Sequence, residues 1–148
     1  MKTLTAIALI GISTAVFSLS KSKCINLEIA VKNNTPYDCY LTQINLKHGY
    51  FLSLETALQT KLSLKIAPGA TSSPLTFAEE YAHGPDVHLS YECGPERTIT
   101  IESKQRLCRG KEGVYGQIIT ATAMDATYTT IVASYWSGTS GKISWILS

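Results

Sequence analysis

The segment from His83 to Arg106 constrains the fold of this chain more than any other. It opens with a Gly-Pro-Asp turn signal, and apolar and polar side chains then alternate from Val87 to Cys93. A second Gly-Pro pair separates this run from another alternating run, Thr98–Ile101. Alternation of period two is what a half-buried strand requires, because successive side chains point to opposite faces of a sheet. A Gly-Pro pair favours a tight reversal of the chain. The segment therefore predicts a β-hairpin.

The rest of the chain repeats this pattern of short runs between turn-forming residues, with clear turn clusters at Asn33–Pro36 and Ala67–Ala70. Beside the hairpin, we expect strands at Ile25–Val31, Tyr37–Leu46, Tyr50–Leu52, Leu62–Ile66, Leu75–Phe77, Val114–Ala121, Tyr128–Trp136 and Ile143–Leu147. There is hardly any helical periodicity, no internal repeat and no linker. These features predict an all-β fold, a single antiparallel β-sandwich of about eight or nine short strands over residues 21–148.

The first twenty residues have the composition of a secretory signal peptide. Lys2 gives a positive start, Leu4–Phe17 is an apolar run, and Ser18 and Ser20 stand where small residues precede a cleavage site. We expect cleavage after Ser20 and export of the remaining chain, either to the periplasm or out of the cell. The alternative is a retained N-terminal anchor, although the apolar run is short for a membrane span.

The charge balance of the expected mature chain excludes some classes of partner. Without Lys2, 12 basic and 11 acidic residues remain, so the net charge is near +1. This balance gives no general reason to expect binding to nucleic acid or to a strongly acidic partner. No later apolar stretch is long enough to cross a bilayer, so we expect no transmembrane segment in the mature chain.

Four cysteines in an exported chain favour two disulfides over a metal site. No two of them form a C-x-x-C pair, which argues against zinc and against a thioredoxin-type redox centre. Of the three connectivities, Cys24 with Cys39 is disfavoured if the first two expected strands form a hairpin, because the two residues would then lie far apart. We therefore prefer Cys24–Cys108 with Cys39–Cys93.

The order of the turns and strands along the chain is a further feature of the sequence. The series runs through Asn33-Asn34-Thr35, Gly49, Ile66-Ala67-Pro68-Gly69-Ala70, Phe77, Gly84-Pro85, Leu89-Ser90-Tyr91 and Ser140-Gly141-Lys142-Ile143. This order resembles the actinoporin and aegerolysin group of secreted β-sandwich proteins, which bind membrane lipids and in some cases form pores. The resemblance covers Ile25–Ile101 and the final strand, and it implies a β-sandwich that recognises lipid.

Three features depart from that group. Pore-forming actinoporins have an amphipathic N-terminal helix, whereas here the mature chain enters a strand almost at once. Their aromatic site for lipid headgroups has no clear counterpart, although Tyr128, Tyr135 and Trp136 lie in a comparable late region. Cysteines are atypical of actinoporins. The resemblance therefore implies recognition of a surface rather than pore formation through such a helix.

Residues that could carry chemistry are few. His83, Asp86 and His88 could in principle bind a metal, but their spacing straddles a turn and no third strong ligand is nearby. We interpret them as a turn histidine and a solvent-facing strand histidine beside a turn aspartate. We expect neither a metal nor a cofactor.

Catalysis is not predicted either. The chain has no G-x-S-x-G motif, and its cysteines are expected to be oxidised. A glycosidase would need two carboxylates held across a cleft, for which Glu79, Glu80 and Asp125 are the candidates. Adjacent Glu79 and Glu80 would point to opposite sides of a strand or diverge on a loop, which favours an ordinary solvated turn. We expect a protein that is not an enzyme.

Two surface features remain as candidate binding sites. The first is a basic loop with four positive charges in eight residues, Lys104, Arg106, Arg109 and Lys111, around Cys108. Cations can bind phosphate headgroups, each contributing about 1 kcal/mol near an anionic membrane. The alternative is an ordinary solvated loop balanced by Glu102 and Glu112.

The second feature is an aromatic set in the last third of the chain: Tyr115, Tyr128, Tyr135, Trp136 and Trp145. Exposed Tyr and Trp stack on sugars or lie at lipid interfaces, because they combine an apolar body with a polar tip. Trp145 lies between Ile143 and Leu147 and is expected in the core. Trp136 precedes Ser-Gly and is expected at the surface.

Together these features predict a secreted non-catalytic binding protein that recognises a membrane lipid surface or a glycan. Loops would carry the specificity on a sandwich scaffold. The alternative is an exported structural or protein-interaction module, adhesin-like or host-directed. A small secreted hydrolase is a third possibility.

Overall fold

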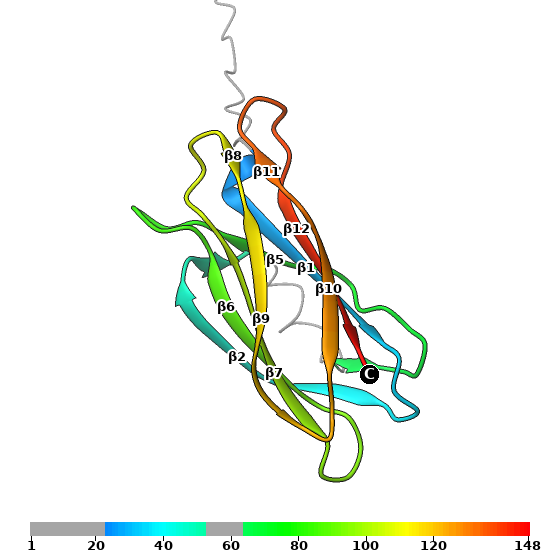
Figure 1. Cartoon of the computed structure of the whole chain (residues 1–148). Helices are drawn as coiled ribbons and strands as arrows, with labels where there is room; N and C mark the ends of the chain where they lie inside the picture. Colours follow the sequence, from blue (N-terminus) through cyan, green and yellow to red (C-terminus); the bar gives the residue numbers. More distant parts are fainter. Residues whose placement is uncertain (1–22, 53–63) are drawn as a thin grey trace, which may run out of the picture.

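The computed structural model describes residues 23–52 and 64–148, which form two five-stranded sheets packed against each other (Figure 1). A short 3-10 turn, η1 (Lys23–Ile25), precedes the first strand. The strands are β1 (Asn26–Asn33), β2 (Cys39–His48), β3 (Tyr50–Phe51), β4 (Lys65–Ile66), β5 (Leu75–Ala78), β6 (Asp86–Glu92), β7 (Thr98–Gln105), β8 (Lys111–Glu112), β9 (Val114–Thr122), β10 (Ala126–Ile131), β11 (Ala133–Ser134) and β12 (Gly141–Leu147). The expected signal peptide, residues 1–20, lies outside the described residues, as does the start of the strand expected from Leu62.

The order of strands is β10-β12-β1-β5-β3 in one sheet and β4-β2-β6-β7-β9 in the other. A separate two-stranded ladder joins β8 to β11. Among the described residues, four of the twelve strands have only two residues, which leaves eight strands of four residues or more. The predicted all-β sandwich is therefore confirmed. No helix in this part of the chain is long and apolar enough to span a membrane.

The predicted hairpin is present as β6 and β7, which pair antiparallel with Leu89 opposite Ile101. Val87, Leu89 and Tyr91 are buried on one face, as the alternation predicts. Gly94 adopts a φ of +87° in the connecting turn, a left-handed conformation that favours glycine. The Gly-Pro signal therefore marks the reversal correctly.

The hairpin expected from the first two strands is wrong, because β1 and β2 lie in different sheets. β1 pairs in parallel with β12 and antiparallel with β5, whereas β2 pairs with β4 and β6. The buried side chain of Asn33 explains the crossing. Its amide donates hydrogen bonds to the carbonyls of Tyr37 and Ile66 at 2.7 and 2.8 Å, and its Oδ1 accepts from Thr35. This turn therefore directs the chain from one layer to the other.

The two disulfides are Cys24–Cys108 and Cys39–Cys93, the pairing preferred from the sequence. The reason for Cys39–Cys93 is not the expected hairpin but the pairing of β2 with β6. Tyr40 lies opposite Glu92, so the next residue pair along this ladder brings the two cysteines together. The two disulfides lie at opposite ends of the sandwich. Cys24 is in η1, which contacts β11, and Cys108 lies between β7 and β8, so the first disulfide is at the end that carries β8 and β11 (Figure 1). Cys39 begins β2 and Cys93 follows β6, so the second disulfide is at the other end.

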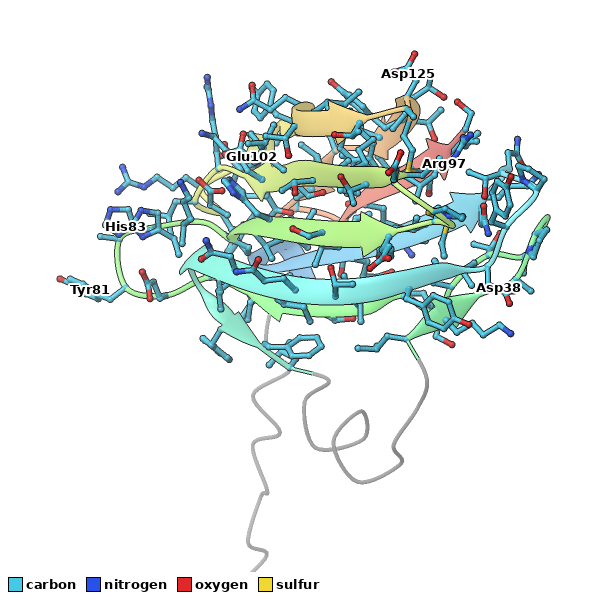
Figure 2. The ribbon with its side chains drawn as sticks, turned by 90° about the horizontal axis from the view of Figure 1, so that it is seen from below. Asp38, Tyr81, His83, Arg97, Glu102 and Asp125 are labelled. Carbon is cyan, nitrogen blue, oxygen red and sulfur yellow. A yellow bond between two sulfur atoms is a disulfide. The ribbon has the colours of Figure 1, made fainter. Side chains whose placement is uncertain are left out.

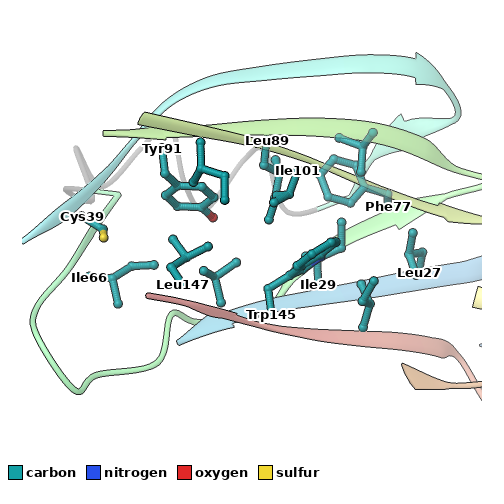
Figure 3. Packing of buried hydrophobic residues seen from close by; sticks show 14 of the residues in the cluster. Leu27, Ile29, Cys39, Ile66, Phe77, Leu89, Tyr91, Ile101, Trp145 and Leu147 are labelled. Carbon is teal, nitrogen blue, oxygen red and sulfur yellow. The ribbon is translucent and has the colours of Figure 1, made fainter. Parts of the chain in front are cut away.

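The core lies between the two sheets and contains Trp145, Phe77 and aliphatic side chains from both (Figure 3). Trp145 is only 1% exposed, as predicted, and its Nε1 donates a hydrogen bond of 2.9 Å to Ser103 Oγ. Gly116 makes room for this indole, because a Cβ there would lie 2.6 Å from Trp145 Cζ2. The Tyr91 side chain is also buried, and this burial raises the pKa of its hydroxyl. The core is thus a tightly packed scaffold.

Candidate functional site

One end of the sandwich gathers three loops, residues 79–85, 106–113 and 132–140, and we call it the loop end (Figure 1). The β8–β11 ladder places Lys111 opposite Ser134, and the Tyr135 amide donates to the Gly110 carbonyl at 2.8 Å. The Cys108 amide donates to Glu79 Oε2 at 2.9 Å. Backbone contacts and the Cys24–Cys108 disulfide therefore hold the three loops together.

Trp136 lies at the tip of a short reversal on this end. The backbone groups of Ser134 and Thr139 exchange two hydrogen bonds of 3.0 Å, and the Gly138 amide donates to the Tyr135 carbonyl. Trp136 is 81% exposed, and its ring meets the Tyr135 ring edge to face with centroids 5.6 Å apart. The predicted exposure of Trp136 is confirmed. A fixed turn thus presents a large aromatic side chain to the outside.

The loop 106–113, which β8 and β11 join to this turn, carries three cations. Arg106, Arg109 and Lys111 are exposed, and within residues 23–52 and 64–148 none of them forms a salt bridge. The guanidinium of Arg106 lies 5.5 Å from the centroid of the Tyr115 ring. The carboxylate of Glu112, which could neutralise the loop, accepts a hydrogen bond of 3.2 Å from the Arg109 amide. The structure therefore brings the basic loop and Tyr135 with Trp136 to one surface.

Two of the predicted site residues lie apart from this surface. Tyr128 is on β10 opposite Trp145, against whose ring it packs with centroids 4.7 Å apart. It precedes Ser134 by six residues of mostly extended chain, which corresponds to roughly 20 Å. Lys104 instead lies near Asp86, with its Nζ 3.9 Å from Asp86 Oδ2. The side-chain contacts of the two residues are thus with Trp145 and Asp86.

A hollow of about 270 Å³ adjoins the loop end, lined in part by His48, His83, Asp86, Lys104 and Arg106. The rings of His48 and His83 stack with centroids 4.2 Å apart and planes 8° from parallel. Figure 2 shows His83 at one end of the molecule, opposite the end that carries Asp38 and Arg97. Sequence reasoning missed His48 here, because His48 and His83 are 35 positions apart.

Sequence reasoning missed Tyr81 of the loop end and considered Glu80 only as a carboxylate of a glycosidase. Tyr81 is 99% exposed at the tip of the turn before His83 (Figure 2). Glu80 lies beside it, with its Oε1 3.1 Å from His48 Nδ1. The Glu79 and Glu80 carboxylates have different partners, Cys108 and His48, so they diverge as expected. A large aromatic residue inside a polar turn before Gly-Pro was the signal that could have marked this tip.

The outer face of the second sheet carries a further polar cluster. His88 was expected to face solvent, but only 12% of its side chain is exposed, because its Nε2 contacts Glu102 Oε1 at 3.1 Å. Gln117 Nε2 donates to the other Glu102 oxygen at 2.6 Å. Burial opposes ionisation of Glu102, but the hydrogen bond with His88 and the nearby Lys104 charge hold its pKa below the ordinary value.

The sandwich has a second unusual surface, the open edges β9 and β10. In the part of the chain that the structure describes, each is the last strand of its sheet. Ile118, Ile119, Ile131 and Val132 expose between 37% and 54% of their surface. The sequence from 113 to 141 has one charged residue, Asp125. This edge is therefore nearly uncharged and exposes several aliphatic side chains.

The fold defines the chain as an all-β sandwich, and known structures share it. The chain is similar to the lipid binding protein Nakanori, with a TM-score of 0.58, 10% identity, and coverage of 84% of this chain and 71% of that chain. It is also similar to IP-1A from Alcaligenes faecalis, with a TM-score of 0.56, 11% identity, and coverage of 85% and 91%. RahU, solved in complex with a Tris molecule, gives a TM-score of 0.56, 10% identity, and coverage of 85% and 96%.

At these identities the likeness shows a shared fold. It agrees with the predicted resemblance to a group of secreted β-sandwich proteins at the level of architecture. No family model and no curated protein sequence matches the chain.

Proposed function

We propose that this chain is an exported, non-catalytic binding protein whose loop end recognises the surface of a lipid membrane. The observation that carries the proposal is Trp136, 81% exposed at the tip of a hydrogen-bonded turn and on the same end of the sandwich as Arg106, Arg109 and Lys111. Tryptophan favours the membrane–water interface because its ring is apolar and its N–H is polar. The three cations on the same end form no salt bridge with another described residue, so they are available to phosphate headgroups.

The expected strength of this contact is modest. Transfer of a large apolar side chain such as that of Trp136 out of water contributes about 2–3 kcal/mol. Each of the three cations adds about 1 kcal/mol near an anionic surface. The total of about 5–6 kcal/mol corresponds to reversible peripheral binding that salt weakens. We therefore expect attachment to the surface of a bilayer.

Two further observations support export and the lipid ligand. The disulfides Cys24–Cys108 and Cys39–Cys93 persist in oxidising compartments such as the periplasm or the exterior of the cell. The similar fold of Nakanori, described as a lipid binding protein, favours lipid over the glycan that exposed aromatics could equally bind.

Flotation with lipid vesicles tests the proposal. Wild-type protein is expected to float with vesicles that contain phosphatidylserine and less with pure phosphatidylcholine. Trp136→Ala is expected to weaken binding about 30-fold or more, from the loss of about 2–3 kcal/mol. A double change, Arg109→Ala with Lys111→Ala, removes the preference for anionic lipid.

Matched controls come from the far end of the sandwich. Tyr40, 47% exposed, and Lys32, also exposed, lie on β2 and β1 away from the loop end, so Tyr40→Ala and Lys32→Ala are expected to bind normally. Failure of the wild type to float with any vesicle would contradict the proposal. A glycan-array signal that Trp136→Ala abolishes would then assign the same surface to a sugar.

The open edge strands favour a second function, self-association of this chain. Natural proteins commonly protect an exposed edge strand with Lys or Pro, but the nine residues of β9 include neither. Its register opposite β7 has one irregularity. Two copies of β9 could pair antiparallel without bringing like charges together, because the strand has none. Sedimentation velocity is expected to show a dimer at high concentration that Ile119→Lys dissociates, whereas a monomer at every concentration would exclude this function.

A further inference from the structure

We propose that His48, Glu80 and His83 form a binding site for a zinc ion at the loop end. Nδ1 or Nε2 of each histidine and a carboxylate oxygen of Glu80 all lie within 4.8 Å of one another. Two imidazoles and one carboxylate are a donor set that zinc uses where it keeps a fourth position for water or another ligand. The site goes beyond membrane binding and does not depend on it.

The backbone around Glu80 and His83 is built to hold these side chains together. Their amides and carbonyls exchange two hydrogen bonds, of 3.1 and 3.2 Å, across the tight turn Tyr81-Ala82. In such an antiparallel pair the two side chains project on the same side of the ladder. Ala82 has a φ of +71°, a conformation that non-glycine residues rarely adopt and that often occurs at functional sites.

Both flanks of this turn are anchored to the scaffold. Before it, the Glu79 amide donates to the Ile25 carbonyl at 2.9 Å, and the Glu79 carboxylate accepts from the Cys108 amide. After it, the Pro85 carbonyl accepts from the Gln105 amide at 2.9 Å. The turn therefore holds its position against the sheets, so Glu80 and His83 meet His48 in a defined geometry.

His48 completes the set from the end of β2. Its Nδ1 lies 3.1 Å from Glu80 Oε1, and its ring stacks on that of His83. Tetrahedral zinc at about 2.1 Å from each ligand requires ligand atoms about 3.4 Å apart. The exposed ring of His83 can close the remaining gap by rotation about its second side-chain torsion, which is broad for histidine.

The surroundings leave room for the fourth ligand. His48 and His83 line the hollow that also contains Asp86, Lys104 and Arg106. Asp86 lies opposite His48 in the β2–β6 ladder, and its Oδ1 is buried with no hydrogen-bond partner among the described residues. A buried carboxylate oxygen without a partner on a residue that lines the hollow can accept a hydrogen bond from water bound to the ion.

The other histidine cluster fits a metal less well. Asp86, His88 and Glu102 also bring ligand atoms within 4.8 Å, but the set has one histidine. Both oxygens of Glu102 are occupied, one by His88 and one by Gln117. A metal there would have to displace these bonds. His88 is therefore the matched control, and the chain has three histidines in all.

Isothermal titration of untagged, metal-free protein with zinc chloride tests the site. One zinc ion per chain is expected. His83→Ala and His48→Ala should each weaken binding by at least about 100-fold, since even outer-shell partners of a metal contribute about 10- to 100-fold. Glu80→Gln should weaken it as well, and His88→Ala should bind like the wild type. Cobalt in place of zinc should give a tetrahedral absorption spectrum that His83→Ala abolishes.

Thermal unfolding without metal shows whether each variant is folded. His83→Ala is the decisive variant, because His83 is an exposed turn residue whose replacement is not expected to disturb the fold. Absence of zinc binding by the wild type would overturn the proposal. So would binding that His83→Ala retains and His88→Ala removes, which would move the ion to the other cluster. Because the titration contains no lipid, its result is separate from that of vesicle flotation.

Discussion

At the scale of single residues, polar side chains on the outer face of the second sheet are coupled in pairs. Glu102 lies opposite His88 on the neighbouring strand, and its two oxygens contact His88 and Gln117. Lys104, two residues further along β7, adds a positive charge nearby. These contacts lower the pKa of Glu102 although burial acts in the opposite direction. Such a group makes the stability of the fold depend on pH.

The sign of this dependence follows from the lowered pKa. Glu102 is more acidic in the folded chain than when unfolded, so its contribution to stability is present above its ordinary pKa of 4.5 and is lost as the pH falls through the lower folded value. We expect the free energy of unfolding of the wild type to fall over this range more than that of Glu102→Gln. Urea unfolding at a series of pH values measures it, and identical pH profiles would contradict the prediction.

At the scale of elements, alternation predicted strands well but could not predict which strands pair. β6 and β7 were recognisable because a single tight turn joins them. β1 was expected beside β2, yet it pairs with β12, more than a hundred residues later in the chain. The buried Asn33 that directs this crossing looks, in sequence, like any turn asparagine. Pairing between distant segments depends on packing of the whole core and leaves no local pattern.

The two disulfides occupy different elements and should therefore have different effects. Replacing either pair with serine is expected to lower the free energy of unfolding by about 2–4 kcal/mol, because each bond closes a long loop. Loss of Cys24–Cys108 should also weaken vesicle binding, because Cys108 holds the basic loop against Glu79. Loss of Cys39–Cys93, at the opposite end, should leave binding unchanged in conditions where both variants remain folded. Chemical denaturation and flotation measure the two effects, and equal loss of binding in both variants would argue against the loop end.

At the scale of the whole molecule, the sandwich brings the exposed Trp136, the basic loop and the His48–His83 pair to one end. Arg109, Lys111 and Trp136 could be singled out from sequence by residue type, but not as one surface. Their proximity depends on a ladder of two residues on each side, β8 with β11, which is too short to recognise from a pattern. His48 and Glu80 meet for a similar reason, since their 32-residue separation is closed by the sheets. The sequence thus identifies candidate residues by type, and the structure shows which of them lie together.

The fluorescence of Trp136 tests the central claim most directly. The chain has two tryptophans, one 81% exposed and one 1% exposed, so Trp145→Phe leaves Trp136 as the single tryptophan, which excitation at wavelengths that tyrosine does not absorb observes alone. On addition of vesicles containing phosphatidylserine, the emission of Trp136 is expected to shift to the blue and to be quenched by lipids brominated near the headgroup. Emission that stays water-like at saturating lipid, in a folded variant, would contradict the account.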